Sequence, residues 1–233
     1  DGLADAMYPV WDASGKYLWF LASTDFGLGS QWLDMTSYDR EETFALYLAV
    51  LRKSDPSPLL PESDEDPGVG GAAPEKDGAK PAPAVQIDFA GLQQRILPVA
   101  GVPSRQYSQL KAGIAGSVFF LEAAPGQGGR NTLHRYRLSD RKSDVFQPGV
   151  AEYAVSADGK KLVYRTPPPQ AAPGAAPAAN ATQRPSLFLV DATTKDAPKA
   201  GDGRLDVTLR MHLDPKAEFA QIFNEGWRLQ RDY

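Results

Sequence analysis

Residues 11–20 read WDASGKYLWF and residues 155–164 read VSADGKKLVY, and the two stretches follow one scheme. In both, a polar residue and Ala precede a Ser-Gly-Lys or Asp-Gly-Lys corner, and Leu, an apolar residue and an aromatic residue come after it. Glycine adopts a positive φ without steric cost, so each corner predicts a tight hairpin that leads into a strand. A degenerate copy, AGSVFF, lies between them at residues 115–120. The chain therefore repeats one hairpin three times.

The spacing of these hairpins predicts the architecture. The interval from Val118 to Leu162 is close to the roughly 40–45 residues of a four-stranded propeller blade. The first interval is longer because it contains an insertion at residues 61–84. We predict an all-β fold over residues 1–212, a partial β-propeller of about three four-stranded antiparallel blades.

Short segments rich in aromatic, branched and Leu residues supply the strands. YLWFL at residues 17–21 and VFFL at residues 118–121 are apolar on both faces, which predicts strands that are covered on both sides. LHRYRL at residues 133–138 alternates apolar and polar residues, which predicts a half-buried strand. The expected blades run from residues 7–10 to 95–99, from Tyr107 to residues 144–146, and from residues 151–155 to 207–210.

Two stretches differ from the rest in composition. Residues 61–84 and 167–185 are rich in Pro, Ala and Gly and contain almost no large apolar residues. Such segments cannot bury enough surface to offset the entropy of ordering, so we expect flexible loops inserted between strands. Proline-rich ligand motifs are the functional alternative.

The last residues change character. Asp214-Pro215 places a side-chain acceptor at an N-cap and proline at the first helical position. Phe219, Ile222, Phe223 and Trp227 then follow at helical spacing and predict an amphipathic α-helix with one apolar stripe. No stop signal comes before Tyr233. We therefore expect residues 213–233 to be the truncated first helix of a following domain.

Composition excludes several classes of function. The 233-residue chain carries a net charge of −4, which argues against a nucleic-acid surface. It has no cysteine and only two histidines, which rules out disulfides and Cys-ligated metals and makes a multi-His metal site an unfavourable interpretation. No apolar run approaches the roughly 18 residues of a membrane span. The chain shows neither a start methionine nor a signal peptide, so we expect it to begin partway along a longer product.

The residues that could serve in catalysis, metal binding or ligand binding can each be interpreted as structural instead. No Gly-x-Ser-x-Gly elbow occurs, and we interpret His134 and His212 as structural histidines. Four carboxylates at residues 62–66 lack the spacing of a calcium loop, and the glycines at 126–129 precede a strand instead of the helix that a phosphate loop needs. Residues 32–35, WLDM, could grip a peptide from a loop, but we favour packing against a neighbouring blade or domain. We predict no catalytic, cofactor-binding or metal-binding residue and no cofactor.

Several longer stretches resemble tricorn-type peptidases, self-compartmentalising serine peptidases with propellers before the catalytic part. The blade motif alone is shared with TolB-like propellers. The order of blade, IDFAGLQQRI and a terminal IFNEGWRLQRDY helix is more specific. The resemblance covers nearly the whole chain apart from the two Pro-rich insertions, and it is carried by residues 1–9, 15–18, 22–25, 32–37, 47–53, 87–96 and 218–233.

The resemblance implies a hydrolase parent in which the catalytic Ser, His and Glu lie C-terminal to this helix. No residue here matches those motifs, so none is carried over. The implied role is a non-catalytic propeller that gates or scaffolds the access of peptides to the catalytic domain. The implied partners are the catalytic and PDZ-like domains of its own chain, unfolded peptides and further copies of the parent. Neither nucleic acid nor a membrane is an expected partner.

The resemblance also implies a cytoplasmic location, with the periplasm as the alternative. Two other functions remain open at this point. One is a stand-alone TolB-like propeller whose loops bind a protein partner. The other is a propeller that binds a glycan or a small ligand, for which scattered Trp and Tyr residues are the only motif-level support.

Overall fold

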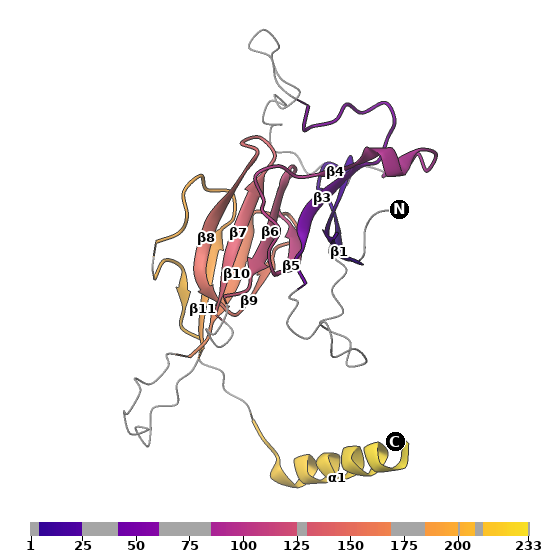
Figure 1. Ribbon diagram of the computed structural model, residues 1–233. Coiled ribbons are helices and arrows are strands. Elements are labelled where there is room, and N and C mark those ends of the chain that lie inside the picture. Colours follow the sequence, from indigo (N-terminus) through magenta and orange to yellow (C-terminus); the bar gives the residue numbers. More distant parts are fainter. Residues whose placement is uncertain are drawn as a thin grey trace.

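Three four-stranded antiparallel sheets form the body of the protein in the computed structural model (Figure 1). The structure describes residues 5–24, 42–60, 85–124, 130–168, 185–199, 201–207 and 212–232. In each sheet the spatial order of the strands follows the chain: β1-β2-β3-β4, β5-β6-β7-β8 and β12-β11-β10-β9. The first strands of neighbouring sheets lie against one another, β1 on β5 and β5 on β9. Sheets that meet at their first strands are blades of a propeller, as the repeat predicts.

The strand limits match the sequence prediction except at the end of the third blade. There the last strand is β12, Arg204–Leu205, before the predicted residues 207–210; residues 208–210 lie outside the described residues. The insertion at 61–84 also lies outside them, as do residues 169–184 of the insertion at 167–185. The remaining strands are β1 Asp5–Trp11, β2 Tyr17–Ser23, β3 Ala45–Val50, β4 Ile96–Pro98, β5 Tyr107–Ala112, β6 Ser117–Glu122, β7 Asn131–Arg137, β8 Lys142–Val150, β9 Glu152–Val155, β10 Lys161–Thr166 and β11 Ser186–Asp191, and a 3-10 helix, η2 Leu92–Arg95, precedes β4.

Glycine with positive φ turns the first hairpin of every blade. The φ angles are 69° at Gly15, 73° at Gly116 and 70° at Gly159, which confirms the three copies of the repeat. The turn between β5 and β6 spans residues 113–116, one residue fewer than the other two turns, which explains the degenerate sequence of this copy. A Cβ on Gly159 would lie 2.4 Å from the backbone carbonyl carbon of Gly113, so the third hairpin packs directly on the second.

Blade two is covered on both faces. Alternate residues of β6 enter two apolar clusters, Val118 and Phe120 against blade one and Phe119 and Leu121 against blade three. The prediction that VFFL is covered on both sides is therefore confirmed. In YLWFL, residues 19–21 are buried, whereas Tyr17 and Leu18 are half-buried. The prediction of a half-buried strand for LHRYRL is wrong, because Arg135 is as buried as its neighbour Tyr136. The polar residue that suggested a solvent-facing side instead points into the interface with blade three.

The C-terminal helix α1, Pro215–Asp232, begins where the sequence predicts. The Asp214 carboxylate oxygen Oδ1 accepts from the backbone N–H of Lys216 at 3.0 Å, and the Asp214 carbonyl accepts from the N–H of Glu218 at 3.0 Å. These bonds satisfy N–H groups that the first turn of a helix leaves without partners. Within the described residues, no helix combines the length and the apolar character that crossing a membrane requires.

Candidate functional site

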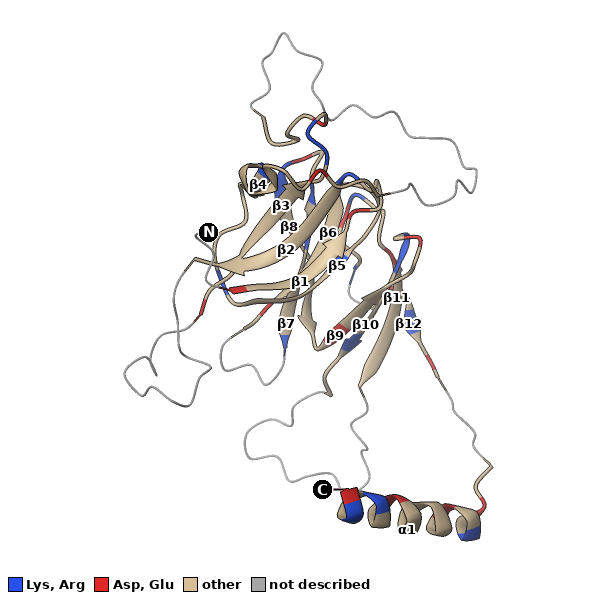
Figure 2. Ribbon diagram, turned by 90° about the vertical axis from the view of Figure 1, so that its right-hand side faces the viewer, with Lys and Arg blue, Asp and Glu red and all other residues tan. Residues whose placement is uncertain are grey.

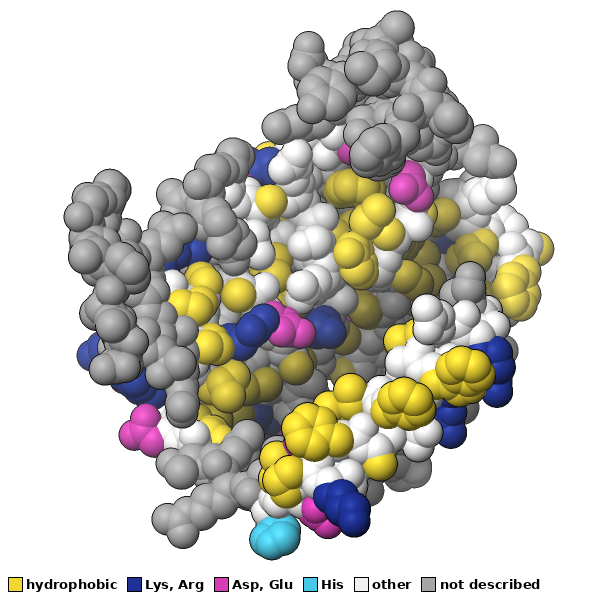
Figure 3. Space-filling view, turned by 90° about the horizontal axis from the view of Figure 1, so that it is seen from below, with side chains coloured by type: hydrophobic (Ala, Val, Ile, Leu, Met, Phe, Trp, Pro, Cys, Tyr) yellow, Lys and Arg dark blue, Asp and Glu magenta, His cyan; other side chains and the backbone are white. Residues whose placement is uncertain are grey.

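The apolar stripe of α1 is the most conspicuous surface feature of the described residues. Phe219, Ile222, Phe223 and Trp227 are all exposed, with 74% of Phe223 and 59% of Trp227 accessible to solvent. None of the described residues of α1 is buried. Seen from below, hydrophobic side chains form a row along the helix (Figure 3). Helices in water usually bury such a stripe, so this face is a candidate docking surface.

The other sides of α1 carry charges of both signs (Figure 2). Glu218 lies in the first turn and Arg231 in the last, which complements the helix dipole. Glu225 and Arg228 form an ion pair at 3.1 Å. Exposed pairs of this kind stabilise little, so the large aromatic side chains dominate what the helix can contribute to binding.

Asp12 connects the first hairpins of blades one and two. Its Oδ2 accepts from the indole Nε1 of Trp19 at 3.0 Å and from the backbone N–H of Gly116 at 2.8 Å. Its Oδ1 accepts from the backbone N–H of Ser14 at 2.9 Å. Only 3% of Asp12 is exposed, and its carboxylate is stabilised because these donors surround it. The residue fixes how the two hairpins sit against each other.

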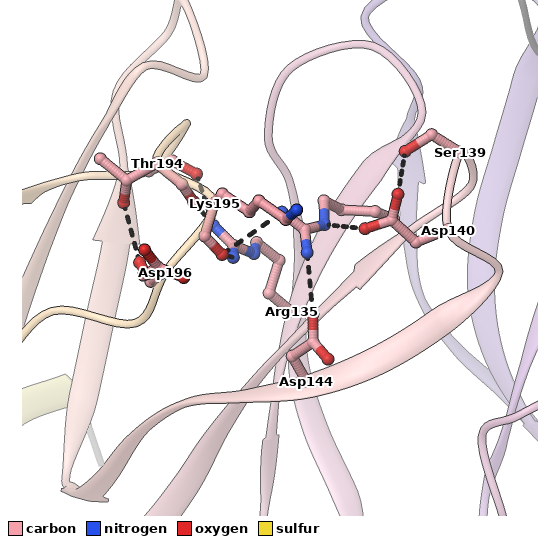
Figure 4. Close-up of polar contacts among 9 residues, drawn as sticks. Arg135, Ser139, Asp140, Asp144, Thr194, Lys195 and Asp196 are labelled. Atoms are coloured by element: carbon pink, nitrogen blue, oxygen red, sulfur yellow. Dashed lines mark hydrogen bonds and ion pairs between the residues drawn. The ribbon is translucent and has the colours of Figure 1, made fainter.

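Arg135 connects blades two and three, and Figure 4 shows its side chain reaching the loop after β11. The guanidinium donates to the carbonyls of Thr194 at 2.5 Å, Lys195 at 2.7 Å and Ala192 at 3.3 Å. It also lies over the Phe146 ring, 5.0 Å from the centroid. Burial lowers the pKa of Arg135, and the Arg137 charge acts in the same direction. Three carbonyl acceptors and an aromatic face are the surroundings that a buried cation needs.

His134 belongs to a polar cluster on blade two. Its Nε2 lies 2.8 Å from Glu122 Oε2, and the other carboxylate oxygen of Glu122 pairs with Arg105 at 2.6 Å. Its ring stacks on Phe120 at 5.5 Å and meets the edge of Tyr107. Burial lowers the pKa of His134, and the Glu122 charge opposes this shift in part. These contacts hold the His134 ring between Phe120, Tyr107 and Glu122.

The remaining predicted positions give no reactive arrangement among the described residues. His212 is exposed and lies before α1. The described residues contain no group of three or more His, Cys, Asp or Glu side chains that could hold a metal ion. The acidic run at 62–66, the glycines at 126–129 and the loop at 32–35 lie outside the described residues.

Reasoning from sequence missed two buried polar residues that connect the blades, Asp12 and Arg135. Asp12 carried a usable signal, because it stands two residues before Ser14 at the start of the β1–β2 turn, where Asp side chains commonly bind backbone N–H groups. Arg135 carried none, because an arginine between His134 and Tyr136, in a strand expected to be half-buried, is interpreted as solvent-facing. Its acceptors lie some 60 residues further along the chain, and only the packing of the blades brings them together.

The chain is similar to two curated proteins over nearly its whole length. The putative tricorn protease homolog 2 of Streptomyces coelicolor is 26% identical over 246 residues, which cover 97% of this chain and 19% of that protein. Tricorn protease homolog 1 of the same organism is 26% identical over 249 residues, covering 97% of this chain and 21% of that protein. The chain is tricorn-like. No family model matches the chain.

Part of the crystal structure of the tricorn protease has the same fold as this chain. The two superimpose with a TM-score of 0.51 over 97% of this chain and 20% of that one, at 18% sequence identity. The chain therefore spans about a fifth of the length of the curated relatives and of the solved structure that it matches. The similarity extends through the blades and α1, so the predicted partial propeller is confirmed.

Proposed function

We propose that this chain is a non-catalytic propeller segment of a tricorn-like serine peptidase. Its blades gate or scaffold the access of unfolded peptides to a catalytic domain C-terminal to α1. The parent hydrolyses peptide bonds, its further domains and copies are the partners of this segment, and it works in the cytoplasm.

The observation that supports this proposal most is the uncovered stripe of α1 directly after the last blade. Phe219, Ile222, Phe223 and Trp227 would be costly to leave in water, at about 25 cal/mol per Å² of apolar surface. A stand-alone propeller has no use for such a helix. A multidomain peptidase has one, because the helix can seat the catalytic part at a fixed distance from the blades.

The first experiment compares the chain with the full-length protein that contains it. The full-length protein should hydrolyse fluorogenic peptides, and the 233-residue chain alone should show no hydrolysis above background. Hydrolysis by the chain alone would refute the assignment. If neither protein hydrolyses peptides and the full-length protein binds a folded protein instead, the TolB-like alternative is favoured.

The second experiment tests the docking role of α1 in the full-length protein. The double variant Phe223→Ser, Trp227→Ser should lower kcat/KM by tenfold or more, because the hot-spot side chains of an interface contribute at least about 2 kcal/mol each. Gln221→Ala and Arg228→Gln change the other side of α1 and are the matched controls, expected to stay within about twofold of wild type. Equal losses in both sets would contradict docking through the stripe.

A further inference from the structure

Blade one is unusual because the longest insertion in the chain interrupts it between its last two strands. The chain leaves β3 at Val50, the insertion at residues 61–84 follows, and β4 begins only at Ile96. β4 is three residues long and pairs with β3 through Tyr47–Pro98, Leu48–Leu97 and Ala49–Ile96. An outer strand this short, placed after a long insertion, needs contacts in addition to its three ladder pairs to stay in the sheet.

Asp88 supplies part of this support on the returning chain. Its backbone N–H donates to the Leu51 carbonyl at 3.0 Å. Its carboxylate oxygen Oδ2 accepts from the backbone N–H of Lys53 at 2.8 Å. Asp88, which follows the insertion, therefore binds Leu51 and Lys53, which precede it. These bonds extend the pairing of β3 and β4 beyond the end of the ladder.

Arg95 supplies the rest from η2. Its guanidinium donates to the carbonyls of Val50 at 3.0 Å and Leu51 at 3.5 Å, on the departing side. On the returning side it donates to the carbonyl of Ala90 at 3.2 Å and to that of Asp88. Its planar fork of donors suits such convergent carbonyls, whereas an ammonium group could serve only some of them. Gly91, at φ 72°, gives the turn that brings Arg95 back toward Val50.

We propose that Asp88 and Arg95 form a clamp that closes blade one independently of residues 61–84. With the clamp in place, the pairing of β3 and β4 does not depend on the length or the conformation of residues 61–84. Residues 61–84 can then be shortened, exchanged or cut while β3 and β4 stay paired. This role also gives a physical reason for the order of residues in IDFAGLQQRI, because the Asp, the Gly and the Arg are its working parts. The inference does not depend on the proposed function.

The length of the insertion should matter little once its ends are fixed. The entropy of closing a loop grows only with the logarithm of its length. Replacing residues 62–83 of the full-length protein by a Gly-Ser linker of half the length should therefore shift the melting temperature by less than about 3 °C. A shift of 8 °C or more would show that these residues themselves hold the blade together and would overturn the proposal.

The decisive experiment cuts the loop. A recognition site for a specific protease is placed within residues 61–84 of the full-length protein, and hydrogen exchange is followed in residues 85–98 before and after complete cleavage. In the otherwise unchanged protein, cleavage should alter the exchange of this segment by less than about threefold. In Arg95→Leu, exchange should be at least tenfold faster before cleavage, because several carbonyls lose their donor, and faster still after it.

Matched variants separate the clamp from general stability. Arg95→Lys keeps the charge but cannot reach acceptors on both sides, so it should behave more like Arg95→Leu than like the wild type. Arg165→Gln removes an exposed arginine that pairs with Glu152 and should leave exchange in residues 85–98 unchanged. If Arg95→Leu does not fold, Asp88→Ala, which removes one contact, takes its place. Tenfold faster exchange on cleaving the unchanged protein, or normal exchange in the clamp variants, would overturn the proposal.

Discussion

Blade two meets blade one and blade three through interfaces that bury similar apolar residues but use opposite polar groups. Toward blade one, the Asp12 carboxylate accepts from the Trp19 indole and the Gly116 backbone N–H. Toward blade three, the Arg135 guanidinium donates to three carbonyls, and the Tyr153 hydroxyl donates to the carbonyl of Phe119. Among the buried side chains named here, an acceptor serves the first interface and donors serve the second. The half-buried Arg141 also donates across the first interface, to the Pro58 carbonyl at 3.2 Å.

This difference shows how a repeated architecture fixes the order of its blades. Apolar contact is not directional, so sheets with similar faces could pair in the wrong order or register. A buried charge tolerates only a face that offers matching backbone groups. Asp12 needs N–H donors and Arg135 needs carbonyls, so the two faces of blade two cannot be exchanged.

Of the changes at the two interfaces, removal of Arg135 should lower the free energy of unfolding most. Arg135→Met keeps most of the apolar stem but leaves three carbonyls without their donor, so we expect unfolding free energy to fall by about 3 kcal/mol. Urea denaturation measures the loss, and hydrogen exchange should place it in residues 192–195. Arg165→Gln, on the exposed side of β10, should cost less than about 0.5 kcal/mol. Similar losses for the two arginines would mean that burial of Arg135 adds nothing.

Replacement of Asp12 should have the next largest effect, at the other interface. Asp12→Ala leaves the Trp19 indole and the Gly116 N–H buried without an acceptor, and we expect a loss of about 2 kcal/mol. Indole fluorescence and urea denaturation report it. Ser14→Ala removes a donor that is only half-buried and should cost less than about 0.5 kcal/mol. A loss confined to the β1–β2 hairpin, with no change at Gly116, would show that Asp12 does not connect the blades.

Removal of the Tyr153 hydroxyl should have a smaller effect. Burial raises the pKa of Tyr153 well above its usual value, so the hydroxyl stays protonated and donates across the second interface. Tyr153→Phe keeps the ring in its apolar cluster and loses that bond, which should cost about 1 kcal/mol. Combined with Arg135→Met, the loss should be additive to within about 0.5 kcal/mol if the two groups act separately. Strong coupling in this double-mutant cycle would instead mean that they act as one unit.

The hairpins could be predicted from sequence, whereas the contacts between blades could not. Gly15 and Gly159 can be identified from sequence because a tight turn with positive φ favours glycine. Asp214 and Pro215 can be identified in the same way, because the start of a helix favours these residue types. The partners of Asp12 and Arg135 are set by how blades pack, which no local pattern encodes. The limits of β12 were missed for a related reason: a two-residue outer strand has almost no pattern to read.

The smallest expected effect is a loss of stability at acid pH. It depends on His134 and not on the polar groups of the two interfaces. Burial lowers its pKa, so below about pH 6.5 the unfolded chain takes up a proton that the folded chain resists. This contribution to stability is complete above pH 6.5 and is lost as the pH falls toward the lower folded pKa. Tyr107 stays neutral throughout, as any tyrosine does in this pH range, and burial raises its pKa further, to about 12.

Replacing His134 by Gln should therefore flatten the dependence of unfolding free energy on pH between 6.5 and 5, by less than the slope of one proton. Denaturant midpoints measured at half-unit intervals of pH test this. Glu122→Gln removes the attraction that supports the protonated ring, so the pKa of His134 should fall further and the acid loss should steepen. Parallel curves for all three proteins would mean that His134 is as free to protonate in the folded chain as in the unfolded one. In that case the stacking on Phe120 and the contact with Glu122 would not shield the ring from water.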